Sequence, residues 1–374
     1  MLVPFNRPTS TGNELELIRE CIFDRRLSGG GEYSELCSEK IAQYLGTAGD
    51  IFMTASCTQA LEASTVILDL NPGDEIIMPS FTFVTTATSF AIRGIKIKFI
   101  DIRPDTLNID EDKIIDAITE RTRAIIPVHY AGVACEMDKI LKIAVDHDLA
   151  VIEDAAQCIM AYYKGRHLGS LGDMSAFSFH DTKNIHCGEG GALVVNRPQL
   201  IDRSHIVINK GTNRKEFLEG NVDKYTWVDL GSSYSMGELT SSYLLSQLIN
   251  LRDITKRRLT LWNRYYGNLS DINLELPSVP FECEHNGHIF YIKLRDKIER
   301  NEILTRLGDE GIQSCFHFVP LHSSPAGRVY GEFVGEDVYT TKESDRLLRL
   351  PIFDSMSLDQ VDYVCENLRQ FYAP

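Results

Sequence analysis

The chain has 374 residues, of which 43% are hydrophobic and 24% charged, and its formal net charge is −15. This acidic balance argues against binding to nucleic acid, which needs a basic face, and no apolar run approaches the roughly 20 residues of a membrane helix. The N-terminus lacks a secretory signal pattern, and the nine cysteines include no CxxC pair, which argues against a disulfide framework or a zinc site. We therefore expect a cytoplasmic protein without a metal, built from two domains or from one large domain with an appendage.

The first two thirds of the chain alternate short apolar runs with helical patterns. This alternation predicts βαβ units and a mostly parallel sheet, whose strands are apolar because helices cover both faces. Ligands bind beyond the carboxyl ends of such strands, so we expect the site in the residues that follow them. Strands are predicted at 74–80, 95–102, 122–130, 149–156 and 176–180, with helices at 85–94, 108–119 and 136–148.

The pattern changes near Gly237. Residues 238–269 have apolar spacing near 3.6 and predict one long helix that leads to a smaller unit. In that unit, residues 289–296 alternate like a strand, and residues 300–311 predict a helix. We expect a large α/β domain at 1–250, including the N-terminal segment, and a small α+β domain at 251–374.

Lys183 lies between a short aromatic strand and a glycine-rich turn. Alternation in the strand puts Phe177 and Phe179 on one face and Ser178 and His180 on the other. An arbitrary lysine is usually a solvated surface residue. An amine at a sheet edge with apolar walls, however, has its charged form disfavoured and can form a Schiff base. The context therefore favours a pyridoxal phosphate site.

Other residues fit the remaining needs of that cofactor. Asp154 ends an apolar strand and is a candidate partner for the pyridine nitrogen, although it could instead cap a helix. Ser56 and Thr58 open an apolar helix whose first amides form an anion site, although capping alone would also explain them. Ser178 is a second candidate phosphate donor, and Phe83 could stack on the ring, although an isolated aromatic residue more often belongs to a core.

Taken together and in this order, these stretches resemble the sugar-nucleotide aminotransferases, a family of fold type I pyridoxal-phosphate enzymes that aminate keto sugars. The resemblance covers nearly the whole length. It implies an aspartate aminotransferase-like fold, with a mostly parallel sheet in the large domain and a smaller C-terminal α+β domain. The motifs include "LSGGGEYSELCSEKIAQYLG", "PGDEIIMPSFTFVTTA", "PVHYAGVACEMDKI", "VIEDAAQ", "FSFHDTKN" and "GEGGALVV".

The resemblance also implies a role for individual residues. Lys183 would be the Schiff-base lysine and proton carrier, Asp154 the partner of the pyridine nitrogen, and Gln157 the neighbour of the 3-hydroxyl. The stacking aromatic would be Phe83. The phosphate cradle would consist of Ser56, Cys57, Thr58 and Ser178.

Two departures from the family pattern concern phosphate binding. The cradle often has the sequence Ser-Gly-Thr, whereas Cys57 takes the middle position here, a change that leaves the backbone donors in place. Many members carry an asparagine near "LGSSYSM", where this chain has serines. Family members are homodimers in which each active site borrows residues from its neighbour, so Ser233 or Ser235 would replace the asparagine contact from the second subunit.

The sugar-nucleotide site is less clearly marked. Lys210 and Arg214 could bind the diphosphate, and a solvated loop explains them equally well. His317 and His322 could line the sugar pocket, although an isolated histidine is usually structural.

The motifs "VPLHSSPAG" and "TTKESDRLLRLPIF" resemble members that make dTDP-4-amino-4,6-dideoxygalactose, an amino-sugar precursor in enterobacterial common antigen or lipopolysaccharide synthesis. The implied reaction takes dTDP-4-keto-6-deoxyglucose and L-glutamate and also yields 2-oxoglutarate. Alternatives are a C4 enzyme that makes the gluco epimer, a C3 aminotransferase, and a non-catalytic cofactor-binding regulator. Lys183 argues against the related dehydratases, in which histidine replaces the lysine.

Overall fold

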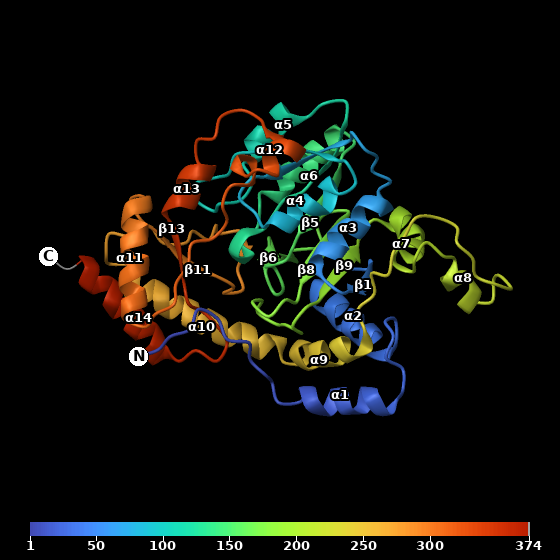
Figure 1. Cartoon of the computed structure of the whole chain (residues 1–374), viewed down its shortest axis with the longest axis horizontal. Helices are drawn as coiled ribbons and strands as arrows, with labels where there is room; N and C mark the ends of the chain where they lie inside the picture. Colours follow the sequence, from blue (N-terminus) through green and yellow to red (C-terminus); the bar gives the residue numbers. More distant parts are fainter. Residues whose placement is uncertain (373–374) are drawn as a thin grey trace.

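A mostly parallel sheet of eight strands forms the centre of the molecule (Figure 1). The computed structural model describes residues 1–372. The strand order is β1-β9-β8-β5-β4-β2-β3-β12, and β9 is antiparallel to both of its neighbours while the other pairs are parallel. The strands are β1 (Asp50–Thr54), β2 (Glu75–Pro79), β3 (Lys96–Ile100), β4 (Thr122–Ile125), β5 (Ala150–Asp154), β8 (Met174–Ser178), β9 (Gly191–Val195) and β12 (Gly331–Phe333).

Each strand predicted in the first two thirds of the chain is present; four have shorter bounds, and the one expected at 176–180 lies two residues earlier, at Met174–Ser178. The strand expected at 122–130 ends at Ile125. Pro127 follows closely and has no N–H to continue the ladder. The expected fold class, α/β with a mostly parallel sheet, is confirmed.

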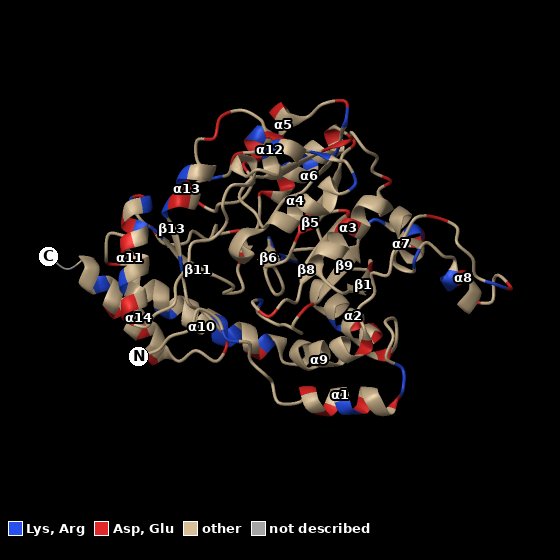
Figure 2. Ribbon diagram, in the orientation of Figure 1, with Lys and Arg blue, Asp and Glu red and all other residues tan. Residues whose placement is uncertain are grey.

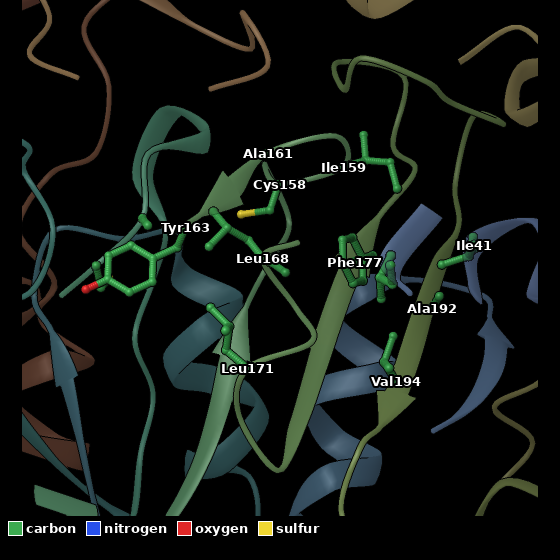
Figure 3. Packing of buried hydrophobic residues seen from close by; sticks show 14 of the residues in the cluster. Ile41, Cys158, Ile159, Ala161, Tyr163, Leu168, Leu171, Phe177, Ala192 and Val194 are labelled. Atoms are coloured by element: carbon green, nitrogen blue, oxygen red, sulfur yellow. The ribbon is translucent and has the colours of Figure 1, made fainter. Parts of the chain in front are cut away.

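Helices cover both faces of this sheet, and alternate residues of its inner strands enter two separate cores. In β9, Val194 packs into one core, whereas Leu193 and Val195 pack into the other. Figure 3 shows Phe177 of β8 inside the first core together with Ala192. The covering helices include α3 (Cys57–Ile67), α4 (Val84–Ala91), α5 (Ile114–Ala117), α6 (Met137–Asp146) and α7 (Ile201–Ile208).

The long helix predicted at 238–269 is two helices that break at Asn250, whose φ of −96° and ψ of 7° are not helical. The two N-terminal helices, α1 and α2, pack against the first of these two helices, α9 (Figure 1). The four helices are α1 (Glu14–Phe23), α2 (Glu32–Leu45), α9 (Glu238–Ile249) and α10 (Leu251–Leu269).

The C-terminal third has its own hydrophobic core, built around a two-stranded antiparallel sheet. Two of its segments nevertheless join the larger part of the chain, because β12 extends the central sheet and β10 (Cys283–Glu284) pairs with β6 (Tyr162–Tyr163). The domain division at residue 250 stays a prediction. The other elements here are β11 (Phe290–Lys293), β13 (Leu347–Leu350), α11 (Lys297–Asp309), α12 (Gly327–Tyr330), α13 (Thr340–Arg346) and α14 (Leu358–Tyr372).

Acidic and basic residues are interspersed on the outer helices, for example along α1 and α11 (Figure 2). Across residues 1–372, no helix has both the length and the apolar character needed to cross a bilayer. One short helix, α8 (Arg214–Leu218), lies at the edge of the molecule on an arm formed by residues 209–233 (Figure 1).

Candidate active site

A cavity of about 760 Å³ lies at the carboxyl ends of β2, β4, β5 and β8. This is the edge at which the sequence predicted a ligand site, because the carboxyl ends of parallel strands meet there. The cavity brings together nine of the residues that the sequence singled out. These are Ser56, Cys57, Thr58, Phe83, Asp154, Gln157, Ser178, Lys183 and His317.

Lys183 lies in the turn that follows β8, where its backbone N–H donates to the carbonyl of His180 (2.9 Å). Burial lowers the pKa of the Lys183 amine from its usual value, an effect that nearby Asp154 opposes and Arg349 increases. Phe177 lies in the core below, whereas Ser178 faces the cavity, as the alternation of the strand predicted. The lysine therefore presents a partly desolvated amine to the cavity, a state that suits a nucleophile.

Asp154 is the last residue of β5, and hydroxyl and amide donors hold its carboxylate. The Thr86 hydroxyl donates to Oδ2 (2.8 Å), and the Ala156 N–H donates to Oδ1 (3.1 Å). The Thr82 hydroxyl lies 2.9 Å from that of Thr86 and acts as its donor, because the Thr86 proton is already committed to Asp154. Residues 155–161 turn without forming a helix, so this carboxylate is held for something other than helix capping.

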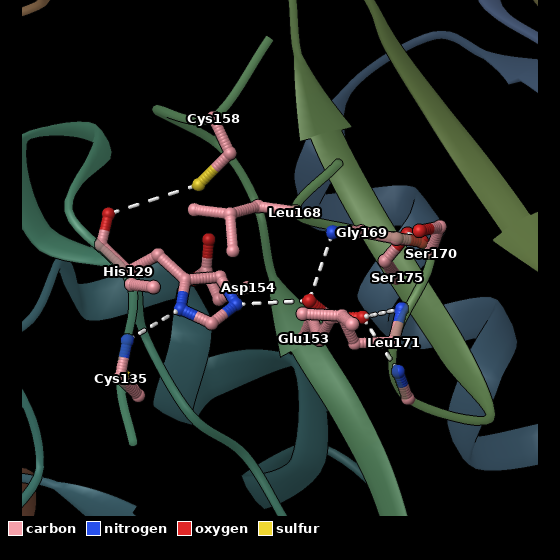
Figure 4. A network of polar contacts seen from close by, with 12 residues as sticks. His129, Cys135, Glu153, Asp154, Cys158, Leu168, Gly169, Ser170, Leu171 and Ser175 are labelled. Atoms are coloured by element: carbon pink, nitrogen blue, oxygen red, sulfur yellow. Dashed lines mark hydrogen bonds and ion pairs between the residues drawn. The ribbon is translucent and has the colours of Figure 1, made fainter. Parts of the chain in front are cut away.

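The neighbouring residue, Glu153, points to the opposite side of the strand and fixes the end of β5 (Figure 4). Its fully buried carboxylate accepts hydrogen bonds from the Nε2–H of His129 (2.9 Å) and from backbone N–H groups, including those of Gly169 (2.8 Å) and Gly172 (2.6 Å). Although burial alone would raise the pKa of Glu153, these donors bring it below its usual value. This network makes the strand end rigid and so orients Asp154 toward the cavity.

Gln157 is held by one end of its amide group. Its Oε1 accepts the backbone N–H of Ala131 (2.7 Å), and Nε2 makes no hydrogen bond within residues 1–372. The side chain lines the cavity, so the amide nitrogen is available to a ligand oxygen.

The N-terminus of α3 forms an anion cradle on the cavity wall. Ser56 caps the helix by accepting the N–H of Gln59 (3.1 Å), and the backbone of Cys57 and Thr58 follows at the cavity surface. A Cβ placed on Gly191 would lie 2.4 Å from the backbone nitrogen of Cys57. Only glycine there lets β9 pass directly beneath the cradle. Burial raises the pKa of the Cys57 thiol, which therefore stays neutral beside an anion.

The opposite wall is aromatic. Phe83 is 56% exposed, and its ring centroid lies 6.4 Å from that of Phe318. His317 stacks on Phe318, and its Nδ1 lies 2.7 Å from the Tyr130 hydroxyl. Burial lowers the pKa of His317 well below its ordinary value, so the ring is neutral. With the amine, the carboxylate and the cradle, this wall completes a set of residues that fits pyridoxal phosphate.

Five residues singled out from the sequence do not line this cavity, and one of them, Ser235, forms a backbone bridge with Thr54 of β1. Lys210, Arg214 and Ser233 belong to the arm at the edge of the molecule (Figure 1). His322 has contacts of its own, because its Nδ1 lies 2.7 Å from the Ser80 hydroxyl and its Nε2 lies 3.3 Å from the Asp337 carboxylate. The substrate and phosphate roles expected for these five residues stay predictions.

Sequence reasoning missed several residues of the cavity. Thr82 and Thr86 lie within the motif "PSFTFVTTA", where two threonines four residues apart across the start of a helix were the available signal. Phe5, His288 and Arg349 come from distant parts of the chain, and neither spacing nor composition links them to Lys183.

Comparisons with known proteins identify the family of this chain. Residues 8–369 match the model of the DegT/DnrJ/EryC1/StrS aminotransferase family. The spore coat polysaccharide biosynthesis protein SpsC of Bacillus subtilis is 34% identical over 376 residues, which cover 98% of this chain and 96% of SpsC. An uncharacterized protein of Methanocaldococcus jannaschii, MJ1066, is 36% identical over 345 residues and covers 90% of this chain and 89% of its own length.

Solved structures show the same fold over the whole chain. DesV of S. venezuelae superposes with a TM-score of 0.91 at 28% identity and covers 100% of this chain and 99% of its own. The aminotransferase TlmJ of Streptoalloteichus hindustanus gives a TM-score of 0.90 at 27% identity, with 99% and 98% covered. The expected enzyme class, an aminotransferase that uses pyridoxal phosphate and acts on a sugar and an amino donor, is confirmed. The chain belongs to the DegT/DnrJ/EryC1/StrS aminotransferase family.

Proposed function

We propose that the enzyme transfers the amino group of L-glutamate to C4 of dTDP-4-keto-6-deoxy-D-glucose, giving dTDP-4-amino-4,6-dideoxy-D-galactose and 2-oxoglutarate. The observation that carries the transamination is that the Lys183 amine, the Asp154 carboxylate and the N-terminus of α3 all face one cavity. The choice of sugar rests on the resemblance of "VPLHSSPAG" and "TTKESDRLLRLPIF" to the branch that makes this product.

The residues of the cavity divide the chemistry among them. When bound, pyridoxal phosphate supplies an electron-withdrawing ring that stabilises negative charge on the carbon that loses a proton. Asp154 accepts a hydrogen bond from the ring nitrogen and keeps it protonated, while Thr86 fixes the carboxylate. The amides of Cys57 and Thr58 bind the phosphate. Gln157 donates from its amide nitrogen to the ring hydroxyl.

Lys183 moves the protons. Its Nζ takes a proton from Cα of the amino donor and, in the second half of the reaction, returns one to C4 of the sugar. Because burial lowers the pKa of this amine, a neutral, proton-accepting Nζ is available nearer to neutral pH than it is for an exposed lysine. The face of the sugar that meets Nζ decides whether the new amine is axial or equatorial.

We infer that the enzyme works as a homodimer in the cytoplasm. The arm at 209–233 exposes Tyr225, Trp227, Val228 and Leu230, and Trp227 is 74% exposed. Exposed apolar side chains grouped on a projecting segment are typical of a protein interface. In a dimer this arm would bring Lys210, Arg214 and Ser233 to the neighbouring cavity, with Ser235, which follows the arm, as the alternative to Ser233.

Product analysis tests the proposed reaction. The enzyme is incubated with dTDP-4-keto-6-deoxyglucose and L-glutamate, and the sugar product is examined by NMR. We expect an amine at C4 in the axial position. An equatorial amine would assign the gluco epimer, an amine at C3 would assign the other branch, and either result would refute the proposal. A Lys183→Ala variant serves as the control and should form no product.

A further inference from the structure

His288 is a buried histidine of the cavity wall, and its backbone is fixed on both sides. It lies two residues before β11, lines the cavity together with Lys183, and is 4% exposed. Its N–H donates to Oδ1 of Asn286 (3.1 Å), and its carbonyl accepts from the guanidinium of Arg258 (2.8 Å). The ring therefore reaches the cavity from a rigid segment, which suits a residue that positions another group.

Asn286 joins this segment to two others that shape the cavity. Its Nδ2 donates to the backbone carbonyls of Gln157 and Ile159 (both 2.8 Å) in the turn after β5. Its own carbonyl accepts the Nδ2–H of Asn184 (3.0 Å), the residue that follows Lys183. The three segments thus meet beside the lysine, although Asn184 and Asn286 are 102 residues apart along the chain.

The hydrogen bonds of Asn184 determine which nitrogen of His288 carries the proton. The Nδ2 of Asn184 faces a carbonyl and is the donor end of the amide, so Oδ1 is the atom that lies 2.8 Å from Nδ1 of His288. Because an amide oxygen only accepts, the ring proton is on Nδ1. A neutral imidazole has one N–H, so Nε2 is a bare acceptor. Within residues 1–372, Nε2 makes no hydrogen bond.

The charges around the ring keep it neutral and indicate that the Lys183 amine lies close to it. Burial lowers the pKa of His288 well below its usual value, and Lys183, Arg258 and Arg349 lower it further, in that order. Lys183 has the larger effect although Arg258 donates to the carbonyl of His288 itself. Since the interaction of two charges falls with their separation, the amine lies near the imidazole ring.

Nζ of Lys183 and Nε2 of His288 complement each other as donor and acceptor. Nζ makes no hydrogen bond within the described part of the chain, although an amine is a donor whether neutral or charged. When Nζ takes a proton from Cα of the amino donor, the Cα–H bond breaks, its electron pair stays with the carbon, and the amine becomes an ammonium group. A buried ammonium group is costly without an acceptor. His288 offers an acceptor that no group in residues 1–372 uses.

We propose that Nε2 of His288 accepts a hydrogen bond from Nζ of Lys183 whenever that amine is free, and so acts as a positioning residue that holds the amine toward the reacting carbon. This assignment rests on the proposed transamination, in which Lys183 moves the protons. Asn184 supports the arrangement by keeping the ring proton on Nδ1, because a ring protonated on Nε2 would present a donor to the amine.

Competitive labelling measures the basicity of the Lys183 amine without turnover. The enzyme is loaded with pyridoxamine phosphate, which leaves the lysine amine free. It is treated with trace acetic anhydride over a range of pH, and peptide mass mapping gives the labelling of Lys183. In His288→Phe, which keeps a ring but removes the acceptor, the labelling midpoint should move to lower pH by about one to two pH units. The reason is that an ammonium group without its acceptor loses its proton more readily.

Two variants serve as controls for this shift. His288→Gln places an amide oxygen near the position of Nε2 and should bring the midpoint back to that of the unmodified enzyme. His147→Phe, at an exposed histidine after α6, should leave the midpoint unchanged. Circular dichroism shows whether each variant folds, and His288→Leu, which also lacks the acceptor, replaces His288→Phe if the latter does not fold.

Two further measurements separate positioning from a structural role. In nitrogen-15 NMR of enzyme labelled at histidine, the His288 signals, assigned by their loss in His288→Gln, should show a protonated Nδ1 and an unprotonated Nε2 near neutral pH. The half-reaction with L-glutamate, followed by stopped-flow absorbance, should be about 10- to 100-fold slower in His288→Phe and should recover in His288→Gln. The KM for the sugar nucleotide should change by less than about twofold.

An unchanged labelling midpoint in His288→Phe would overturn the proposal, as would an equal shift in His288→Gln or a protonated Nε2. A rise in the KM for the sugar nucleotide alone would assign Nε2 to a substrate hydroxyl instead of Lys183, and the proposal would also fail. These outcomes are separable from the proposed function. A wrong sugar substrate would leave the labelling result standing, whereas normal turnover by Lys183→Ala would refute the proposed function whatever the labelling shows.

Discussion

Substitution of Thr86 tests most specifically how the protein holds its cofactor. Thr86→Val replaces a hydroxyl by a methyl group of similar size at a fully buried position. The variant loses the 2.8 Å hydrogen bond to Oδ2 of Asp154 and leaves the Thr82 hydroxyl without its acceptor. A hydrogen bond to a charged group contributes about 1.5–3 kcal/mol. We therefore expect pyridoxal phosphate to bind about 10- to 150-fold more weakly.

Equilibrium dialysis, with the cofactor absorbance as readout, measures this loss. Thr86→Ser keeps the hydroxyl and is the matched control, with cofactor binding close to that of the unmodified enzyme. Thr82→Val should have a smaller effect than Thr86→Val because it acts one hydrogen bond further from the carboxylate. If Thr86→Val binds the cofactor as tightly as Thr86→Ser, the hydroxyl does not position Asp154 and the reasoning fails.

Three further predictions concern the cradle, the lysine and acid stability. Gly191→Ala places a Cβ within 2.4 Å of the Cys57 backbone nitrogen, so cofactor affinity measured by dialysis should fall at least about tenfold. Gly267→Ala is the control, because a Cβ on this glycine of α10 meets open space, and it should leave the affinity unchanged. Lys183→Ala should still bind the cofactor yet lose both half-reactions in stopped-flow absorbance, and a rate near that of the unmodified enzyme would remove Lys183 from its role. Burial lowers the pKa of His167 to about 4 in the folded protein, whereas the unfolded chain takes up this proton near pH 6.5. The free energy of unfolding should therefore be full above pH 6.5 and should decrease by about 3 kcal/mol as the pH falls toward 4. Urea unfolding should show this loss, and it should be smaller in His167→Gln.

Much of the fold was predictable because its signals are local. The apolar runs that became β2, β3 and β5 are bounded by turns, and the helices between them have clear periodicity. The break in the long helix was not predictable, since the pattern continues through Asn250 without a proline or glycine. The separation at residue 250 was also hard to judge, because β12 crosses back into the central sheet.

In the candidate site, too, the residues with local sequence signals were predictable and the others were not. Lys183, Asp154 and Ser56 each follow or precede a recognisable strand or helix. Their positions at the ends of strands therefore predicted that they share a site, and all three line one cavity. Arg349 and Phe5 reach the cavity only through tertiary packing, and their positions depend on contacts between segments more than 300 residues apart along the chain. For Lys210 and Arg214, the sequence identified cations but did not reveal the projecting arm that carries them.

The most direct test of the account is chemical labelling of the loaded enzyme. Treatment with borohydride fixes the cofactor to the side chain that holds it, and peptide mass mapping then locates the attachment. We expect a yellow protein that loses its visible band and carries the added mass on Lys183. A colourless protein, or an adduct on a different lysine, would contradict it.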